Sequence, residues 1–261
     1  MPPLLFEQDR GIARLTLNRP EHANSIDLAM TRALLEAAIR CDTDPTIRCV
    51  VLTGAGRLFC AGGDIDAFVS AGEGIPALLS ETAGTLHLAM SKLARMEKPL
   101  VGLVNGPAAG AGLSLAILGD VVIAARSAHF TVAYSGIGLT PDGGCTWLLP
   151  RLIGLRKAQE MIITNRRVKS DEAERLGLVT RVVDDDALAL EGEKIATELC
   201  RSAVSSLGVA RGLLLESFNG GLESHMEREA RAIAAAGSGP ESREGISAFL
   251  AKRKPEFDAL S

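Results

Sequence analysis

The sequence lacks the patterns that mark several common classes of protein. It has no Cys-x-x-Cys pair and an odd number of cysteines, which argues against a disulfide framework and a zinc site. It has no long basic block, and its formal net charge is -4, so we expect no nucleic-acid partner. No run of about 18 uncharged apolar residues occurs, so we expect no membrane contact. The five cysteines are Cys41, Cys49, Cys60, Cys145 and Cys200.

Targeting and cofactor motifs are absent as well. The start, MPPLLFEQDRG, has neither a basic region nor a long apolar run, so we expect no secretory signal and a cytoplasmic protein with free thiols. The dinucleotide fingerprint fails twice, because Phe59 and Leu115 stand where a third glycine is required, and no P-loop occurs. The stretch around Ser114 approaches a nucleophile elbow but ends in alanine, which favours a packed helix residue. The four histidines show no metal-ligand spacing, so we expect no metal; they are His22, His87, His129 and His225.

The order of strand-like and helix-like segments predicts an α/β fold. Two strands turn at Asp9-Arg10-Gly11, and Asp27 is predicted to cap a helix over residues 28–40. Hydrophobic residues make up 47% of the chain, enough for a large core. Further along, buried strands are predicted at 47–54, 100–106 and 120–125, and helices at 78–99, stopped by Pro99, and at 110–119.

The second part of the chain is predominantly helical. A last strand is predicted at 179–185, between the second and third of six helices. These helices are predicted over 155–163, 170–176, 187–204, 206–217, 222–236 and 241–252. No linker rich in proline or glycine separates the two parts. The sequence therefore predicts an α/β core over residues 1–185 and a helical region over residues 186–261 that packs on the core or on a neighbouring subunit.

Two loops that follow buried strands are crowded with glycine and alanine. They are TGAGRLFCAGGD, residues 53–64, and NGPAAGAG, residues 105–112. Small residues let a ligand approach the backbone and leave N–H groups free to point at it. A helix is expected near the end of each loop, which favours an anion there. We expect these loops to hold a phosphate or a charge that develops in a transition state.

A lone carboxylate, Asp142, lies in GLTPDGGCTWLLPRLIG, residues 138–154. Pro-Asp-Gly is ordinary turn chemistry, so a turn alone would explain it. Its apolar surroundings predict partial desolvation, which raises the pKa of a carboxyl group and suits proton transfer. Both interpretations, turn and catalytic group, remain open from the residues alone.

The two loops and the Asp142 segment resemble the crotonase superfamily, also called the enoyl-CoA hydratase/isomerase family. The matching pieces are LNRPEHANSID, TGAGRLFCAGGDI, KPLVGLVNGPAAGAGLSLAILGDVVIAARSAHF, GLTPDGGCTWLLPRLIG and REGISAFLAKRKPEF. The resemblance implies a spiral of repeated ββα units, a helical C-terminal trimerisation region, and a homotrimer or dimer of trimers. It also implies acyl-CoA substrates with no separate cofactor, and an oxyanion hole made by the N–H groups of Gly63 and Ala111.

The same resemblance assigns roles to further positions. The two catalytic glutamates of the hydratases fall on Ser114 and Tyr134, neither of which is a good base at neutral pH. Asp142 matches the proton-shuttling aspartate of the epoxyphenylacetyl-CoA isomerases in the family. The implied activity is an isomerase that moves a double bond, or opens a ring epoxide, through an enolate with Asp142 as acid and base. The implied substrate-binding residues are Arg19, His22, Ala23, Ala61, Gly62, Asp64, Ile65, Gly110, Ser114, Tyr134, Pro141, Phe249 and Lys252.

Three alternatives stay open beside the isomerase. One is a hydratase, a lyase that uses another base. A second is a relative of the 4-chlorobenzoyl-CoA dehalogenases, whose nucleophilic aspartate also matches Asp142; against it, their histidine position falls on Ser91, and His87 lies one helical turn earlier. A third is a non-catalytic acyl-CoA-binding protein, because a fold alone does not prove chemistry. In every case we expect residues 75–88 and 139–148 to line the acyl pocket.

Overall fold

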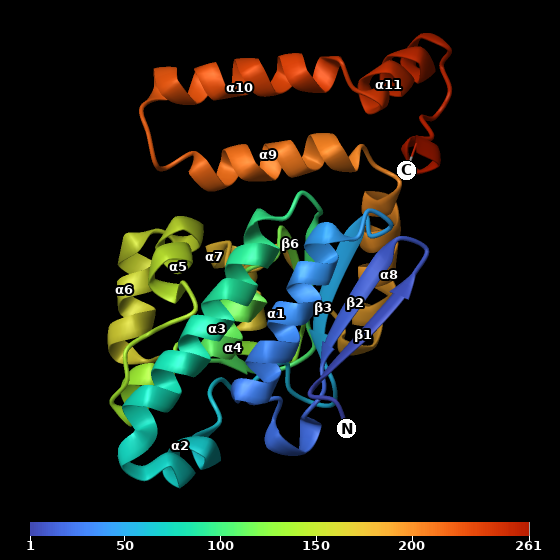
Figure 1. Cartoon of the computed structure of the whole chain (residues 1–261). Helices are drawn as coiled ribbons and strands as arrows, with labels where there is room; N and C mark the ends of the chain where they lie inside the picture. The colour runs from blue at the N-terminus through green and yellow to red at the C-terminus, as the bar shows by residue number, and fades with distance from the viewer. Residues whose placement is uncertain (261) are drawn as a thin grey trace.

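A six-stranded sheet with helices on both faces forms the centre of the molecule. The computed structural model describes residues 1–260 (Figure 1). Strands β1 (Leu4–Asp9) and β2 (Ile12–Leu17) pair antiparallel, and the other four join in parallel in the order β1-β2-β3-β4-β6-β9. These are β3 (Cys49–Gly54), β4 (Leu100–Val104), β6 (Val121–Ala125) and β9 (Arg181–Val183). The predicted α/β fold is confirmed.

Both faces of the sheet are covered, which explains why its central strands are continuous apolar runs. Alternate residues point to opposite faces. Leu15 and Val50 pack beneath α1 (Leu28–Thr43) and α3 (Ile75–Arg95). Val51, which follows Val50 on β3, and its partner Val101 on β4 pack with α8 (Leu188–Cys200) on the other face.

The ends of helices α1 and α3 are set by polar side chains. Asp27 caps α1 as predicted, since its Oδ1 accepts the Met30 N–H at 2.7 Å. At the other end of α1, the Lys98 ammonium donates to the carbonyls of Cys41 and Asp44, both at 2.6 Å. Residues 96–98 form a bend, and α3 ends at Arg95 and not at Pro99 as predicted. The residue before a proline disfavours helix, which moves the helix end upstream.

Short elements complete the core, and the sequence did not predict several of them. A second sheet joins β5 (Ala108–Ala109), β7 (His129–Thr131) and β8 (Val168–Lys169). Strands of two or three residues are too short to show a period of two. Helix α5 was also missed, because two glycines precede it and Pro150 lies inside it. The remaining helices of this part are α2 (Ile65–Ala71), α4 (Ala111–Ala116), α5 (Cys145–Ile153), α6 (Leu155–Thr164) and α7 (Ser170–Leu176).

Three helices form a separate layer at the end of the molecule opposite α2 (Figure 1). They are α9 (Val204–Glu216), α10 (Leu222–Gly237) and α11 (Pro240–Leu250). Helix α8, the first of the predicted helical region 186–261, instead packs on the sheet. Residue 261 of that region lies outside the described residues. No helix in residues 1–260 has the length and apolar character needed to cross a membrane.

Polar side chains anchor the C-terminal layer to the core. The Arg211 guanidinium of α9 pairs with Asp120 at 2.7 Å and donates to the carbonyls of Leu93 and Met96 at the end of α3. Within the layer, the Glu241 carboxylate accepts from the backbone N–H groups that open α9, which include Ser205 at 3.0 Å. These contacts satisfy helix-end groups that have no partner within the helix itself. The layer is therefore fixed at the opposite end of α3 from α2.

Candidate active site

The two glycine-rich loops lie against each other. Residues Cys60 and Ala108 form a parallel bridge, and the Ala109 N–H donates to the Cys60 carbonyl at 2.9 Å. Gly62 has a φ of +101°, which a side chain disfavours. At Gly112, a Cβ atom would lie 2.3 Å from the Cys60 carbonyl oxygen. The absence of side chains is therefore what lets the two backbones meet.

This contact brings the two predicted oxyanion donors, Gly63 and Ala111, to the wall of one cavity. Ala111 is the first residue of α4, and Gly63 lies two residues before α2. Neither backbone N–H donates to another group among residues 1–260. Free N–H groups that face one space can bind a developing oxyanion there.

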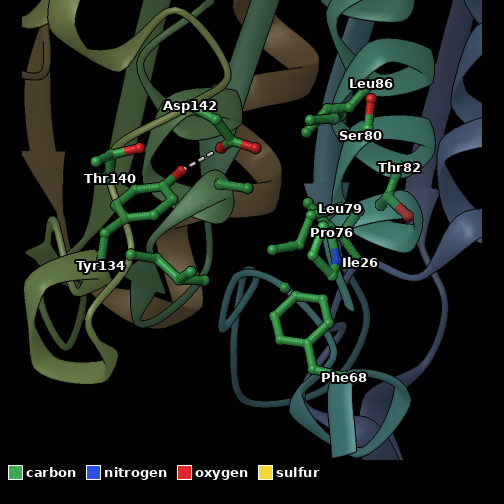
Figure 2. A pocket seen from close by; sticks show the side chains of 14 residues that line it. Ile26, Phe68, Pro76, Leu79, Ser80, Thr82, Leu86, Tyr134, Thr140 and Asp142 are labelled. Carbon is green, nitrogen blue, oxygen red and sulfur yellow. Dashed lines mark hydrogen bonds between the residues drawn. The ribbon is translucent and has the colours of Figure 1, made fainter. Parts of the chain in front are cut away.

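The cavity has a volume of about 390 Å³ and lies between α3 and the segment that carries Asp142 (Figure 2). Its walls are mainly apolar. As predicted, parts of residues 75–88 and 139–148 line it, but Ile26 and Phe68 were missed. The helix expected after the first glycine-rich loop is α2, which Asp64 caps and which carries Phe68. The lining residues are Ile26, Gly63, Phe68, Pro76, Leu79, Ser80, Thr82, Ala83, Leu86, Ala111, Tyr134, Leu139, Thr140 and Asp142.

Asp142 lies in the predicted turn, three residues before the start of α5. Its carbonyl accepts from the Cys145 N–H at 3.0 Å and from the Ser114 hydroxyl at 3.2 Å. Its side chain is held by the Tyr134 hydroxyl, which donates to Oδ1 at 2.5 Å (Figure 2). No group among residues 1–260 donates to Oδ2. The residue is thus both a turn residue and a fixed carboxylate on a cavity wall.

Tyr134 and Ser114 support Asp142 in different ways. Burial, followed by the negative charge of Asp142, raises the pKa of the Tyr134 phenol. Tyr134 therefore stays protonated and serves as a donor. Ser114 is buried in α4 and does not line the cavity, which agrees with a packed helix residue that braces the turn.

His87 lies closer to this site than the sequence indicated. In the sequence, the distance of His87 from the dehalogenase position argued against that chemistry. In the structure His87 is exposed on α3, and its Nε2 accepts the Gly143 N–H at 3.0 Å. An imidazole nitrogen therefore contacts the residue that follows Asp142.

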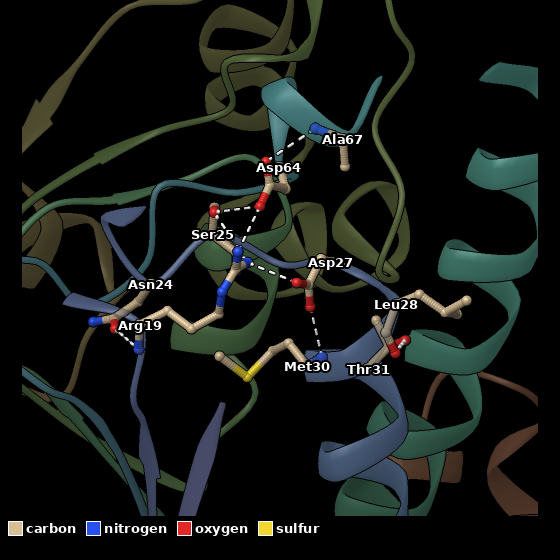
Figure 3. A network of polar contacts seen from close by, with 9 residues as sticks. All are labelled: Arg19, Asn24, Ser25, Asp27, Leu28, Met30, Thr31, Asp64 and Ala67. Atoms are coloured by element: carbon tan, nitrogen blue, oxygen red, sulfur yellow. Dashed lines mark hydrogen bonds and ion pairs between the residues drawn. The ribbon is translucent and has the colours of Figure 1, made fainter. Parts of the chain in front are cut away.

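Arg19 belongs to a polar network beside the cavity (Figure 3). Its guanidinium pairs with Asp64 at 2.8 Å and Asp27 at 3.2 Å, and it donates to the Ser25 carbonyl at 2.7 Å. Burial alone would raise the pKa of Asp64, but hydrogen bonds from Arg19 and the Ala67 N–H hold it below its ordinary value. Arg19 thus fixes the loops.

The other residues that the resemblance assigned to substrate binding fall in three places. The first place is an edge of exposed or half-exposed residues, which consists of His22, Ala23, Ala61 and Ile65. In this edge the Ala61 N–H donates to the Ala23 carbonyl at 3.0 Å. Gly62, Gly110 and Pro141 are neighbours of residues in the cavity wall. Phe249 and Lys252 lie on α11 and just after it, far from the cavity in one chain (Figure 1).

Among residues 1–260, no group of three or more histidine, cysteine or acidic side chains is placed to hold a metal ion. Beside the hydroxyls of Ser80, Thr82 and Thr140, the cavity wall carries the Asp142 carboxylate, the Tyr134 phenol and two backbone amides. This set can move a proton and stabilise an oxyanion.

Known proteins share this architecture. A solved structure of an enoyl-CoA hydratase from a Polaromonas species superimposes with a TM-score of 0.92 at 32% identity, over 97% of this chain and 98% of that chain. The fold is therefore the α/β crotonase fold with a helical C-terminal region. Residues 7–259 match the family described as Enoyl-CoA hydratase/isomerase. The chain belongs to this family, and we conclude that it is an enzyme that acts on an acyl-CoA.

Named relatives include an isomerase and hydratases. A 1,2-epoxyphenylacetyl-CoA isomerase from Escherichia coli is 40% identical over 255 residues, which are 97% of each chain. A 2,3-dehydroadipyl-CoA hydratase from Escherichia coli is 32% identical over 257 residues, 98% of this chain and 99% of the relative. Family membership therefore leaves the reaction to be inferred from the site.

Proposed function

We propose that the chain is an acyl-CoA isomerase that moves the double bond of an enoyl-CoA, with a ring epoxide as a further substrate type. One observation carries the proposal: the Asp142 carboxylate lines the same cavity as two N–H groups without partners. A base and an oxyanion site on one cavity wall are the two parts that enolate chemistry needs. The resemblance to the isomerases of the family at Asp142 supports this assignment.

The mechanism uses one base twice. With the thioester oxygen at Gly63 and Ala111, Asp142 removes a proton from C2 of a 3-enoyl-CoA, and the electron pair delocalises onto that oxygen as a dienolate. Asp142 then returns the same proton at C4, which leaves the double bond between C2 and C3. No water is consumed. Each oxyanion donor stabilises the transition state by about 3–4 kcal/mol in comparable sites.

The two positions that hold catalytic glutamates in the hydratases are occupied here by Ser114 and Tyr134. This difference favours isomerisation over hydration. Ser114 lies behind the Asp142 turn, and Tyr134 is a phenol whose pKa burial raises. Neither can activate water at neutral pH. Asp142 is then the base of the site, and it already has a partner that fixes its direction.

Proton NMR in deuterated buffer tests the reaction directly. A 3-enoyl-CoA and, separately, a 2-enoyl-CoA are incubated with the purified protein. We expect the double bond to migrate, with proton transfer or exchange at C2 and C4. A 3-hydroxyacyl-CoA product from the 2-enoyl substrate would show hydration instead and contradict the proposal. Binding of both thioesters without any turnover would favour the non-catalytic alternative.

We further propose that CoA lies along the edge formed by His22, Ala23, Ala61 and Ile65, and that Phe249 and Lys252 of a second copy complete the site. The support is the resemblance and the exposed apolar surface of the C-terminal layer, where Ile233 is 74% and Phe249 82% exposed. Such a surface is typical of an interface.

The proposed trimer, or dimer of trimers, predicts the behaviour of an Ile233→Glu variant. A charge on the apolar face of α10 should shift the protein from trimer or hexamer to monomer, as measured by sedimentation velocity. The variant should also lose CoA affinity, because Lys252 of the second copy is removed. A monomeric wild-type protein would contradict the proposal.

The charges of the cavity predict its acyl selectivity. Its lining holds one carboxylate, Asp142, and no lysine, arginine or histidine. A second carboxylate there would be poorly solvated and repelled by the first. Calorimetry should therefore show hexanoyl-CoA binding at least about tenfold more tightly than adipoyl-CoA, which has the same chain length. A Ser80→Lys variant should reduce this difference, whereas equal affinities for the wild type would contradict it.

Hydrolytic dehalogenation is the second candidate, because an imidazole lies beside Asp142. His87 contacts Gly143 despite its displacement by one helical turn from the dehalogenase position. In that reaction Asp142 would attack the ring carbon and expel chloride, and water would then cleave the ester. Chloride release from 4-chlorobenzoyl-CoA would support this candidate.

A further inference from the structure

We infer that His87 is a positioning residue that sets the place of the Asp142 carboxylate by holding the next peptide group. The inference rests on the proposed role of Asp142 as acid and base. His87 itself does not line the cavity. It acts through the Gly143 N–H, which donates to its Nε2 at 3.0 Å.

The turn that carries Asp142 needs external restraint. Gly143 and Gly144 have φ values of +59° and +71°, and glycines have more accessible backbone conformations than other residues. A rotation about the backbone torsions of Gly143 and Gly144 would shift Asp142, and with it the carboxylate, relative to α5. The contacts that oppose this rotation are therefore part of how the base is placed.

Three elements hold the turn, each at a different atom. Tyr134 binds the Asp142 side chain, and Ser114 of α4 binds the Asp142 carbonyl. His87 binds the Gly143 N–H and is the contact that comes from α3. Because α3 also supplies the opposite cavity wall, from Pro76 to Leu86, this contact fixes the base relative to the wall that would seat the acyl group.

The nature of the contact restricts which side chains can make it. Nε2 accepts the hydrogen bond, so it carries no proton, and in a neutral ring the proton is on Nδ1. Packing does not explain the residue, because His87 is exposed while its neighbour Leu86 is buried. Loss of this contact matters for the rate because displacement of a reacting group, here the Asp142 carboxylate, by 1 Å can cost about 100-fold.

Three substitutions separate a hydrogen-bond acceptor from a space-filling side chain. Glutamine places Oε1 at about the reach of Nε2, asparagine is one bond shorter, and leucine has no acceptor. We expect His87→Leu and His87→Asn to lower kcat about 10- to 100-fold with KM changed less than about threefold. His87→Gln should stay within about fivefold of the wild-type kcat. Equal losses in Gln and Leu would overturn the inference.

Hydrogen exchange at the Gly143 amide tests the contact without any turnover. Exchange should be faster in the Leu and Asn variants and near wild type in the Gln variant, with thermal melting unchanged as a check on folding. Unchanged exchange, or faster exchange with unchanged kcat, in His87→Leu would overturn the positioning role. Failure of the proposed function has a different signature: double-bond migration would be missing in the wild type, while exchange still depends on residue 87.

Discussion

Asp142→Asn is expected to lower kcat for double-bond migration by at least about 10³-fold, with little change in KM. The amide keeps the size of the carboxylate, and its Oδ1 can still accept from Tyr134. It cannot take up a proton from C2, however, and so neither half of the transfer proceeds. The KM is preserved because the carboxylate does not hold the CoA moiety in the proposed complex. Rates are measured by NMR or by the absorbance of the conjugated product.

Tyr134→Phe is the matched control for this variant. It removes one hydrogen bond to Asp142 and leaves the base in place, so we expect a loss of about tenfold only. Deuterium exchange at C2 should disappear in Asp142→Asn and persist in Tyr134→Phe. Full isomerase activity in Asp142→Asn would show that another group moves the proton.

Gly112→Ala is expected to destabilise the protein by about 2–3 kcal/mol and to lower kcat at least about tenfold. The added Cβ would lie 2.3 Å from the Cys60 carbonyl oxygen, 2.7 Å from the Cys60 Cβ and 2.8 Å from its Sγ. Because one of these atoms belongs to the backbone, the two glycine-rich loops must separate. The Ala111 N–H, one residue before, then moves relative to that of Gly63.

Gly84→Ala provides the control, since it makes the same substitution in α3 where a Cβ would meet nothing within 4 Å. Alanine favours an exposed helix, so this variant should be about 0.5–1 kcal/mol more stable than the wild type and retain its kcat. Denaturant unfolding and single-turnover rates give both quantities. An active and fully stable Gly112→Ala would show that the close contact of the loops is dispensable.

Local sequence signals predicted the elements that depend on neighbouring residues. Asp27 capped α1 as expected, because an N-cap needs only an oxygen placed three residues before a backbone N–H. The buried strands β3, β4 and β6 were recognised, since both faces of each are apolar. The two glycine-rich loops were recognised because glycine and alanine occur where backbones must approach closely.

Contacts between distant residues were beyond this kind of prediction. The ion pairs of Arg19 with Asp27 and Asp64 were not predicted, and its contact with substrate stays a prediction. His87 had no motif to mark it, because its partner is a backbone N–H 56 positions away. Helix α5 was missed for a local reason, because glycine and proline usually end helices.

The sequence by itself determined the α/β class, the family and the identity of the candidate base, since these follow from residue types and their order. Only the tertiary structure decided that Gly63, Ala111 and Asp142 line one cavity and that Asp142 keeps one carboxylate oxygen unbound. It also decided that the Ser114 hydroxyl donates to the Asp142 carbonyl and that His87 accepts from the Gly143 N–H. The physical reason is that hydrogen bonds are directional over about 3 Å, so their partners are fixed by the packing of segments far apart in the chain.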